Sequence, residues 1–186
     1  MRLQVNAEKS AVRRPHQVHF LGFRFRCTRG PYANIGVVLS EKTERRLAAT
    51  IRTMTPPNLG RSIATCMQRL SQYLTGWMAH FRSCTVEAAK RLGQIDAHVR
   101  RRVRAIIVRQ KKRQRFLFRH LRALGVSRKA AAGAAYCGRG AWRRSNLPAL
   151  TRAYPPSWLT GRLTSLQVRW KELNSAQVSD QLMLAL

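Results

Sequence analysis

Carboxylates are scarce in this 186-residue sequence, which has 7 Asp and Glu against 36 Lys and Arg. Its two aspartates, Asp96 and Asp180, lie far apart, and the glutamates are scattered. Catalysis with two Mg²⁺ ions needs several carboxylates that converge, because hard cations prefer oxygen ligands. The sequence therefore indicates no catalytic residues, no metal site and no cofactor of its own.

Paired cysteines and long apolar runs are also missing. The four cysteines are far apart in the sequence, with no C-x-x-C pair and no spacing typical of zinc ligands, so we expect reduced, mostly buried thiols. No apolar run reaches about 18 residues, and the first residues lack the apolar core of a secretory signal. We therefore expect a cytoplasmic protein with no membrane partner.

Positive charge is concentrated in the second half of the chain. Residues 97–171 contain 20 Lys and Arg and no carboxylate. Such a segment would repel itself in a compact fold unless a polyanion or counterions neutralised it. Arginine supplies 29 of the 36 cations, and its planar fork grips phosphate oxygens in pairs, although a GC-rich genome would also favour arginine codons. The phosphate backbone of a nucleic acid is the expected counterpart.

The apolar pattern predicts a short β-containing start followed by helices. Residues 3–26 have β and turn character, and residues 37–39 are expected to add one strand. Ser40 is placed to cap a first helix and Ser62 a second. The second has the strongest helical signal, with apolar residues three or four positions apart at Ile63, Met67, Leu70, Leu74, Trp77 and Phe81.

A third helix is predicted after Thr85, with Leu92, Val99 and Val103 on its apolar face. If it continues to Arg115, its opposite face carries a cationic stripe roughly 21 Å long. A solvated face normally mixes charges of both signs, so this stripe favours contact with phosphates. Its members are Arg101, Arg104, Lys111, Lys112 and Arg115.

Beyond the stripe, Gly125 is expected to end a helix and Ser127 to begin an alanine-rich one that reaches Tyr136. Residues 137–145 read as a basic, glycine-rich loop around Trp142. Its indole would either stack on an unpaired base or pack the loop onto the core. His98 and His120 are interpreted as surface or phosphate-contact residues.

Several motifs resemble those of group II intron reverse transcriptases, also called maturases. Leu3–Ser10 and Phe20-Leu-Gly-Phe23 resemble the end of the family's palm, and residues 73–82, Tyr-Leu-Thr-Gly-Trp-Met-Ala-His-Phe-Arg, are similar to the signature of its thumb, domain X. Residues 100–107, 124–127 and 140–143 match later segments in the same order. The resemblance covers nearly all of residues 1–170.

The resemblance implies a mainly α protein in three parts. Residues 1–39 would be a remnant of the palm, residues 40–112 the three-helix thumb, and residues 113–186 a basic helical C-terminal region. The residues expected in its structural core are Phe20, Phe23, Tyr73, Leu74, Gly76, Trp77, Phe81, Val99 and Val103.

The implied partner is group II intron RNA, and an RNA/DNA duplex is a second expected ligand. Lys9 matches a palm lysine that lies near the primer and template in the family. The other residues expected to bind RNA are cationic, apart from one tryptophan: Arg100, Arg101, Arg102, Arg104, Arg109, Lys111, Lys112, Arg113, Arg115, Arg139, Trp142, Arg143 and Arg144.

The catalytic Y-A-D-D aspartates of the family are absent from this sequence and would lie upstream of Met1. We therefore expect no polymerase activity from this chain alone, and Mg²⁺ only if an upstream catalytic palm completes it. The leading interpretation is an RNA-binding protein that assists intron splicing. The alternatives are the C-terminal subunit of a split RNA-directed DNA polymerase and a non-functional remnant of a mobile element.

Overall fold

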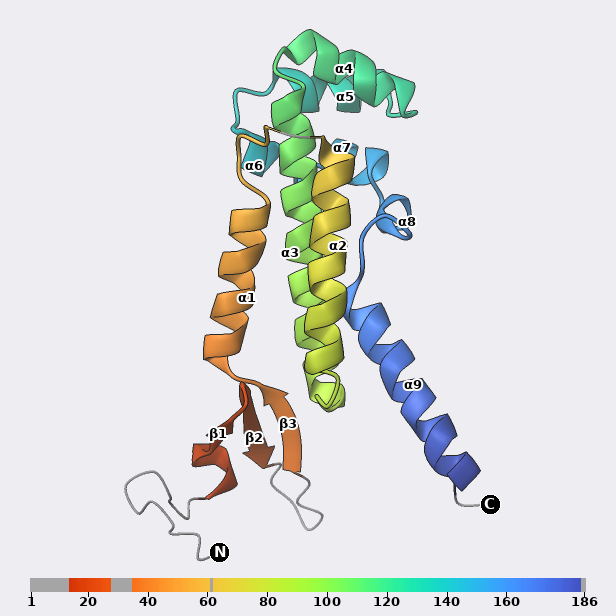
Figure 1. Cartoon of the computed structure of the whole chain (residues 1–186). Coiled ribbons are helices and arrows are strands. Elements are labelled where there is room, and N and C mark those ends of the chain that lie inside the picture. Colours follow the sequence, from red (N-terminus) through yellow and green to blue (C-terminus); the bar gives the residue numbers. More distant parts are fainter. Residues whose placement is uncertain (1–13, 28–34, 61, 185–186) are drawn as a thin grey trace, which may run out of the picture.

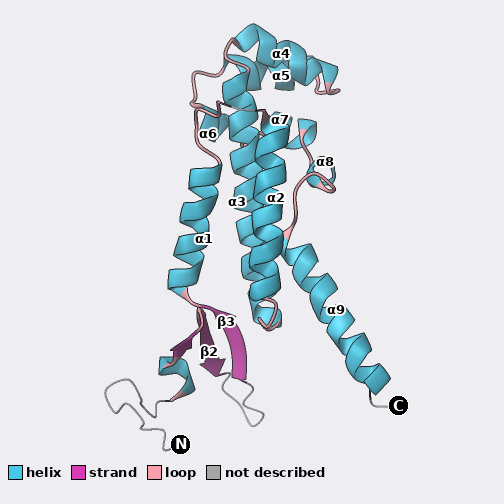
Figure 2. Cartoon of the chain, viewed as in Figure 1, coloured by secondary structure: helices cyan, strands magenta, loops and turns pink. Residues whose placement is uncertain are grey.

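The structure is a computed structural model that describes residues 14–27, 35–60 and 62–184, with the side chains of 86–87 and 176–184 left out of the description. It is mostly helical, as predicted, with a small sheet at one end (Figures 1 and 2). The sheet is antiparallel in the order β1 (His19–Phe20), β2 (Phe23–Cys27), β3 (Ile35–Leu39), and the 3₁₀ turn η1 (Pro15–Gln17) precedes it.

Two long helices, α2 and α3, run side by side through the middle of the molecule, with α1 on one side and α9 on the other (Figure 1). The helices α4 and α5 pack against each other across one end of this bundle, and the sheet lies at the opposite end. The helices are α1 (Glu41–Met54), α2 (Ile63–His80), α3 (Val86–Gln110), α4 (Gln114–Ala123), α5 (Arg128–Tyr136), α6 (Ala141–Arg144), α7 (Pro148–Ala153), α8 (Pro156–Leu159) and α9 (Leu166–Leu184).

The predicted helix starts are confirmed by their caps. The backbone N–H of Thr43 donates to Ser40 Oγ at 3.2 Å, and that of Thr65 donates to Ser62 Oγ at 3.1 Å. Each bond satisfies one N–H group that has no partner within its own helix. The predicted turn between α4 and α5 is also confirmed, because Gly125 has a positive φ of 79° and the N–H of Val126 donates to Leu121 O.

One continuous core joins the helices. Apolar side chains from each long helix are buried within it, and the predicted Leu74, Val99 and Val103 are 2% exposed or less. The C-terminal elements belong to the same core through Leu121, Leu150 and Leu166, so burial of their apolar faces holds the basic half of the chain on the bundle.

The two resemblance motifs meet at the foot of the bundle. Leu21 and Gly22 both have positive φ, which gives the tight turn that suits a two-residue β-hairpin. A Cβ on Gly22 would lie 2.7 Å from Thr43 Oγ1, and this hydroxyl donates to Gly22 O at 2.8 Å. Phe23 then packs edge to face on Phe81 of the second motif, with ring centroids 5.2 Å apart. Gly22 is required here by both its φ and the close approach of α1.

Two residues expected in the core, Phe20 and Gly76, are exposed instead. Phe20 is 60% exposed because it lies on the two-residue edge strand β1, where one neighbouring strand is present and no described helix covers it. Gly76 lies on the outer face of α2, with no atom within 4 Å of the position that a Cβ would take. Tyr73, Trp77, Phe81 and Phe23 are partly buried and pack against the core.

The predicted third helix is shorter than the stripe requires. It ends at Gln110, and Arg113 already caps the next helix, α4. The chain changes direction here because Leu117 and Leu121 are buried by packing of α4 against α5 and α7. A continuous stripe from Arg101 to Arg115 is therefore wrong. Residues 137–145 are likewise not all loop, since α6 forms one helical turn around Trp142.

Candidate nucleic-acid interface

Exposed cations gather where α3 passes into α4, at one end of the bundle (Figure 1). On α4, burial of Leu117 and Leu121 turns Arg115 and Arg119, which are four residues apart, outward into solvent. Sequence reasoning missed Arg119, although its spacing from Arg115 marks the same helix face. We define the cationic junction as the exposed residues Arg109, Lys112, Arg113, Arg115 and Arg119.

The cationic junction has no carboxylate to neutralise it within the described part of the chain. The ion pairs seen elsewhere among the described residues use the carboxylates of Glu41, Glu44 and Glu172. Their cations are Arg24, Arg45, Arg91 and Arg169. The shortest of these ion pairs joins Arg91 Nη2 to Glu44 Oε2 at 2.6 Å. It raises the pKa of Arg91, chiefly through the hydrogen bond between the two side chains. These pairs lie outside residues 97–168, so the charge of the junction remains available to an external anion.

Trp142 packs onto the fold through Arg101. The Arg101 guanidinium carbon lies 4.0 Å from the centre of the indole ring, and its Nη2 donates to Trp142 O at 3.2 Å. This cation–π contact covers one face of the indole, and the side chain remains 37% exposed. Trp142 therefore contacts Arg101 but is not part of the apolar core, and stacking of its indole on an unpaired base stays a prediction.

Arg102 ties the end of α1 to α3. Its Nε donates to Thr55 Oγ1 at 2.6 Å, and its Nη2 donates to Thr55 O at 2.7 Å. A cation at the C-terminal end of a helix satisfies carbonyl groups that have no partner within it and interacts favourably with its dipole. Burial lowers the pKa of Arg102, and the nearby Arg52 and Arg109 lower it further.

Arg104 and Arg144 also serve the fold. Arg104 is 7% exposed and donates from Nε to Ser145 O at 3.0 Å, which fixes α6 on α3. Burial lowers its pKa, and so do Arg100 and Arg101 beside it. Arg144 is half-buried and donates to Ala135 O, near the end of α5, at 3.4 Å. A contact between Arg104 and RNA stays a prediction, but this side chain has little surface to offer.

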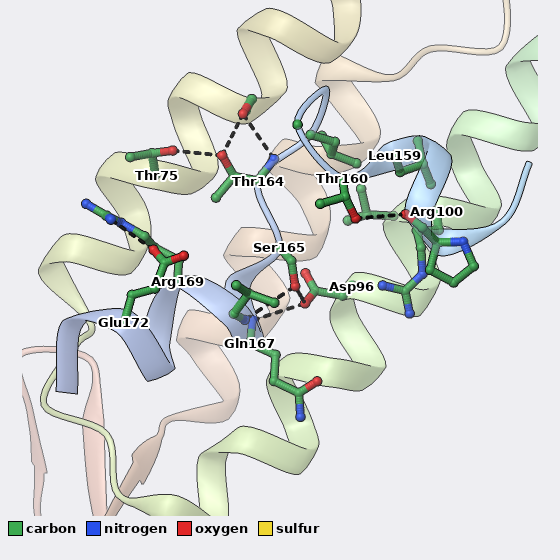
Figure 3. Close-up of a pocket in the computed structure, with 16 residues that line it drawn as sticks. Thr75, Asp96, Arg100, Leu159, Thr160, Thr164, Ser165, Gln167, Arg169 and Glu172 are labelled. Carbon is green, nitrogen blue, oxygen red and sulfur yellow. Dashed lines mark hydrogen bonds and ion pairs between the residues drawn. The ribbon is translucent and has the colours of Figure 1, made fainter. Parts of the chain in front are cut away.

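Arg100 faces a different surface, an open pocket of about 670 Å³ beside the start of α9 (Figure 3). Asp96 occupies this helix start: its carboxylate accepts from Ser165 Oγ at 2.7 Å and from the N–H groups of Leu166 and Gln167 at 2.9 and 3.0 Å. Nearby, Thr164 bonds to Ser71 of α2. Because a carboxylate already satisfies these N–H groups, they are not free to bind a phosphate.

The remaining predicted residues are divided among several places. Arg139 and Arg143 are exposed around α6, whereas Lys111 is half-buried at the end of α3. Lys9 lies outside the described residues. The structure therefore brings together four residues of the predicted set at the cationic junction, and the other members of the set lie elsewhere. The four are Arg109, Lys112, Arg113 and Arg115.

Two further properties concern the described residues as a whole. None of their helices is both long and apolar enough to cross a membrane. They also contain no group of three or more His, Cys, Asp or Glu side chains placed to hold a metal ion. The four cysteines carry free thiols, and Cys66 and Cys84 are buried. Burial raises the pKa of Cys84 to about 12, so this thiol is protonated at neutral pH.

Comparison with known proteins identifies the central part of the chain. No curated protein matched it. Among protein-family models, the one for the group II intron, maturase-specific domain matches residues 44–125. This segment begins in the first turn of α1, includes α2 and α3, and ends at Gly125 after α4, so it contains the cationic junction. Residues 44–125 are therefore similar to the group II intron maturase-specific domain, in agreement with the motifs in this part of the sequence.

Proposed function

We propose that this chain binds group II intron RNA through the cationic junction and assists splicing by neutralising phosphates as the intron folds. The observation that carries the proposal is the position of these cations. They are exposed, they have no carboxylate partner among the described residues, and they lie inside the maturase-specific domain. A maturase-type role is what this domain supports in general.

The electrostatics favour a polyanion over a small acidic ligand. The formal net charge is +29, and a charge of that size destabilises a compact chain by self-repulsion. A phosphate backbone presents many negative charges at regular intervals, and Arg can grip two phosphate oxygens at once. Binding RNA would therefore relieve repulsion within the protein while the protein relieves repulsion within the folded intron.

The first prediction concerns salt. We expect the affinity for a fluorescently labelled group II intron transcript to fall about a thousandfold between 50 and 200 mM salt if about six phosphates are contacted, because binding releases condensed counterions. Fluorescence anisotropy over this range gives the slope of log K against log salt. An affinity that does not change with salt would contradict phosphate-dominated binding.

The small sheet favours a second candidate function. Phe20, Leu21 and Ile35 are 60%, 66% and 55% exposed, and β1 is an edge strand of the sheet that the described residues form. The outer side of β3 is partly occupied, because the N–H of Thr85 donates to Val37 O at 2.9 Å. Edge strands offer unpaired N–H and C=O groups to another chain. We propose, as the alternative, that this end of the molecule docks onto a separate polypeptide that carries the catalytic palm of a reverse transcriptase.

The alternative is tested by reconstitution. If the chain is one part of a split polymerase, mixing it with an upstream reverse transcriptase fragment that contains the catalytic aspartates should produce cDNA synthesis well above the sum of the separate parts. A Leu21→Ser variant should reduce this gain and leave RNA affinity unchanged. Synthesis that stays at the level of the upstream fragment alone would rule the alternative out.

A further inference from the structure

His98 lies in a part of α3 that the cationic junction does not include. Its ring is half-buried, with its centre 5.5 Å from the centre of the Trp142 ring on α6. Arg101 and Arg102 follow it on α3, and Arg52 reaches the same place from the last turn of α1. Figure 1 shows α6 next to the C-terminal end of α1, beside α3. Three elements thus bring one imidazole and three guanidinium groups together.

The charges that face His98 all have the same sign. Its pKa is lowered by burial, and further by Arg102, Arg52 and Arg101. Helix α6 adds Arg143 and Arg144 and no carboxylate. Four carboxylates have described side chains, and each is engaged or placed elsewhere. Asp96 is turned toward the start of α9, Glu172 pairs with Arg169 on α9, and Glu41 and Glu44 lie in the first turn of α1, at its opposite end. At neutral pH the imidazole is therefore uncharged among cations.

Hydrogen bonds to the backbone hold two of these cations, Arg101 and Arg102, in place before any ligand arrives. Arg102 is fixed by Thr55, and Arg101 by Trp142 O and the indole ring. Carbonyl and hydroxyl partners are neutral, so they position the guanidinium groups without cancelling their charge. Side chains fixed in this way lose little conformational freedom when an anion binds.

We propose that Arg52, His98, Arg101 and Arg102 form a phosphodiester-binding site at which RNA binding is coupled to uptake of one proton by His98. This inference rests on the proposed RNA-binding function and adds a site and a pH dependence to it. A bound phosphodiester supplies the negative charge that the cluster lacks. It therefore favours the imidazolium ion, which can donate a hydrogen bond to a phosphate oxygen.

The coupling is tested by the pH dependence of binding. Because the imidazole is neutral in the free protein and charged in the complex, affinity should rise as pH falls. For an increase of about one pH unit in the midpoint on binding, affinity should rise severalfold, and by no more than about tenfold, between pH 8 and pH 5.5. Anisotropy with a labelled group II intron transcript should show this rise for the wild type and lose it in His98→Gln. His80→Gln, which removes an exposed histidine at the end of α2, is the matched control.

A second measurement does not depend on a variant. In the wild-type chain with ¹³C-labelled histidines, the NMR titration midpoint of His98 should move to higher pH when the transcript is added. RNA binding with an unchanged His98 midpoint would overturn this inference and leave the proposed function standing. Absence of RNA binding at low salt would remove both. Equal pH dependence in the wild type and His98→Gln would also overturn the proton coupling.

Discussion

Replacing Arg113, Arg115 and Arg119 together with glutamine should weaken binding of the intron transcript by about two orders of magnitude at 0.1 M salt. Each phosphate contact contributes roughly 0.7 to 0.9 to the slope of log K against log salt, so three lost contacts should reduce the slope by about 2 to 3. The fold should be retained, because all three side chains are exposed and the apolar face of α4 is unchanged. Anisotropy measured at several salt concentrations gives both quantities.

The matched control removes the same charge elsewhere. Lys42, Arg45 and Arg46 are exposed on α1, near Glu41 and Glu44, and their replacement with glutamine also lowers the net charge by three. We expect this variant to lose less than about threefold in affinity, because its cations lie beside carboxylates and away from the junction. Equal losses in the two variants would mean that net charge alone, and not the cationic junction, attracts the RNA.

Replacing Asp96 with alanine should lower the free energy of unfolding by about 2 to 3 kcal/mol. The carboxylate is 4% exposed and accepts three hydrogen bonds at the start of α9 (Figure 3), so its removal leaves buried N–H groups without a partner. Equilibrium denaturation with urea, followed by circular dichroism, measures the change from the shift in midpoint.

Two further variants separate the cap from the charge. Asp96→Asn retains an oxygen acceptor, so its free energy of unfolding should fall by about half as much as that of Asp96→Ala. Glu172→Ala also removes one negative charge from this region, but its ion pair with Arg169 is exposed, so we expect a change below about 0.5 kcal/mol. If Asp96→Ala were as stable as Glu172→Ala, the carboxylate would not be the cap that holds α9.

Local signals in the sequence are sufficient to predict where helices with strong patterns begin and end. Ser40 and Ser62 mark helix starts because a hydroxyl can accept from an N–H group of the first turn, and Gly125 marks a helix end because it tolerates positive φ. The four-residue spacing of Leu70 and Leu74 also predicts α2, because helical periodicity decides which side chains are buried, and both are buried in the core.

The partners of individual arginines could not be predicted in the same way. Arg102 contacts Thr55 and Arg104 contacts Ser145, both more than 40 positions away, and only tertiary packing brings these pairs together. The end of α3 at Gln110 has the same origin, because it depends on where α4 finds a surface for Leu117 and Leu121. A cationic helical pattern thus shows where positive charge is concentrated in the sequence, but not which of its side chains face outward.

The guanidinium groups that cross-link helices in the basic half bond to neutral backbone oxygens: Arg102 to Thr55 O, Arg104 to Ser145 O and Arg144 to Ala135 O. Tertiary links of this kind join the elements while leaving the electric field of the molecule undiminished. Because these links cancel no positive charge, we expect dissolved anions to stabilise the isolated chain. The intron would then act as a structural component of the protein, completing its charge balance in the way that a partner subunit completes a core.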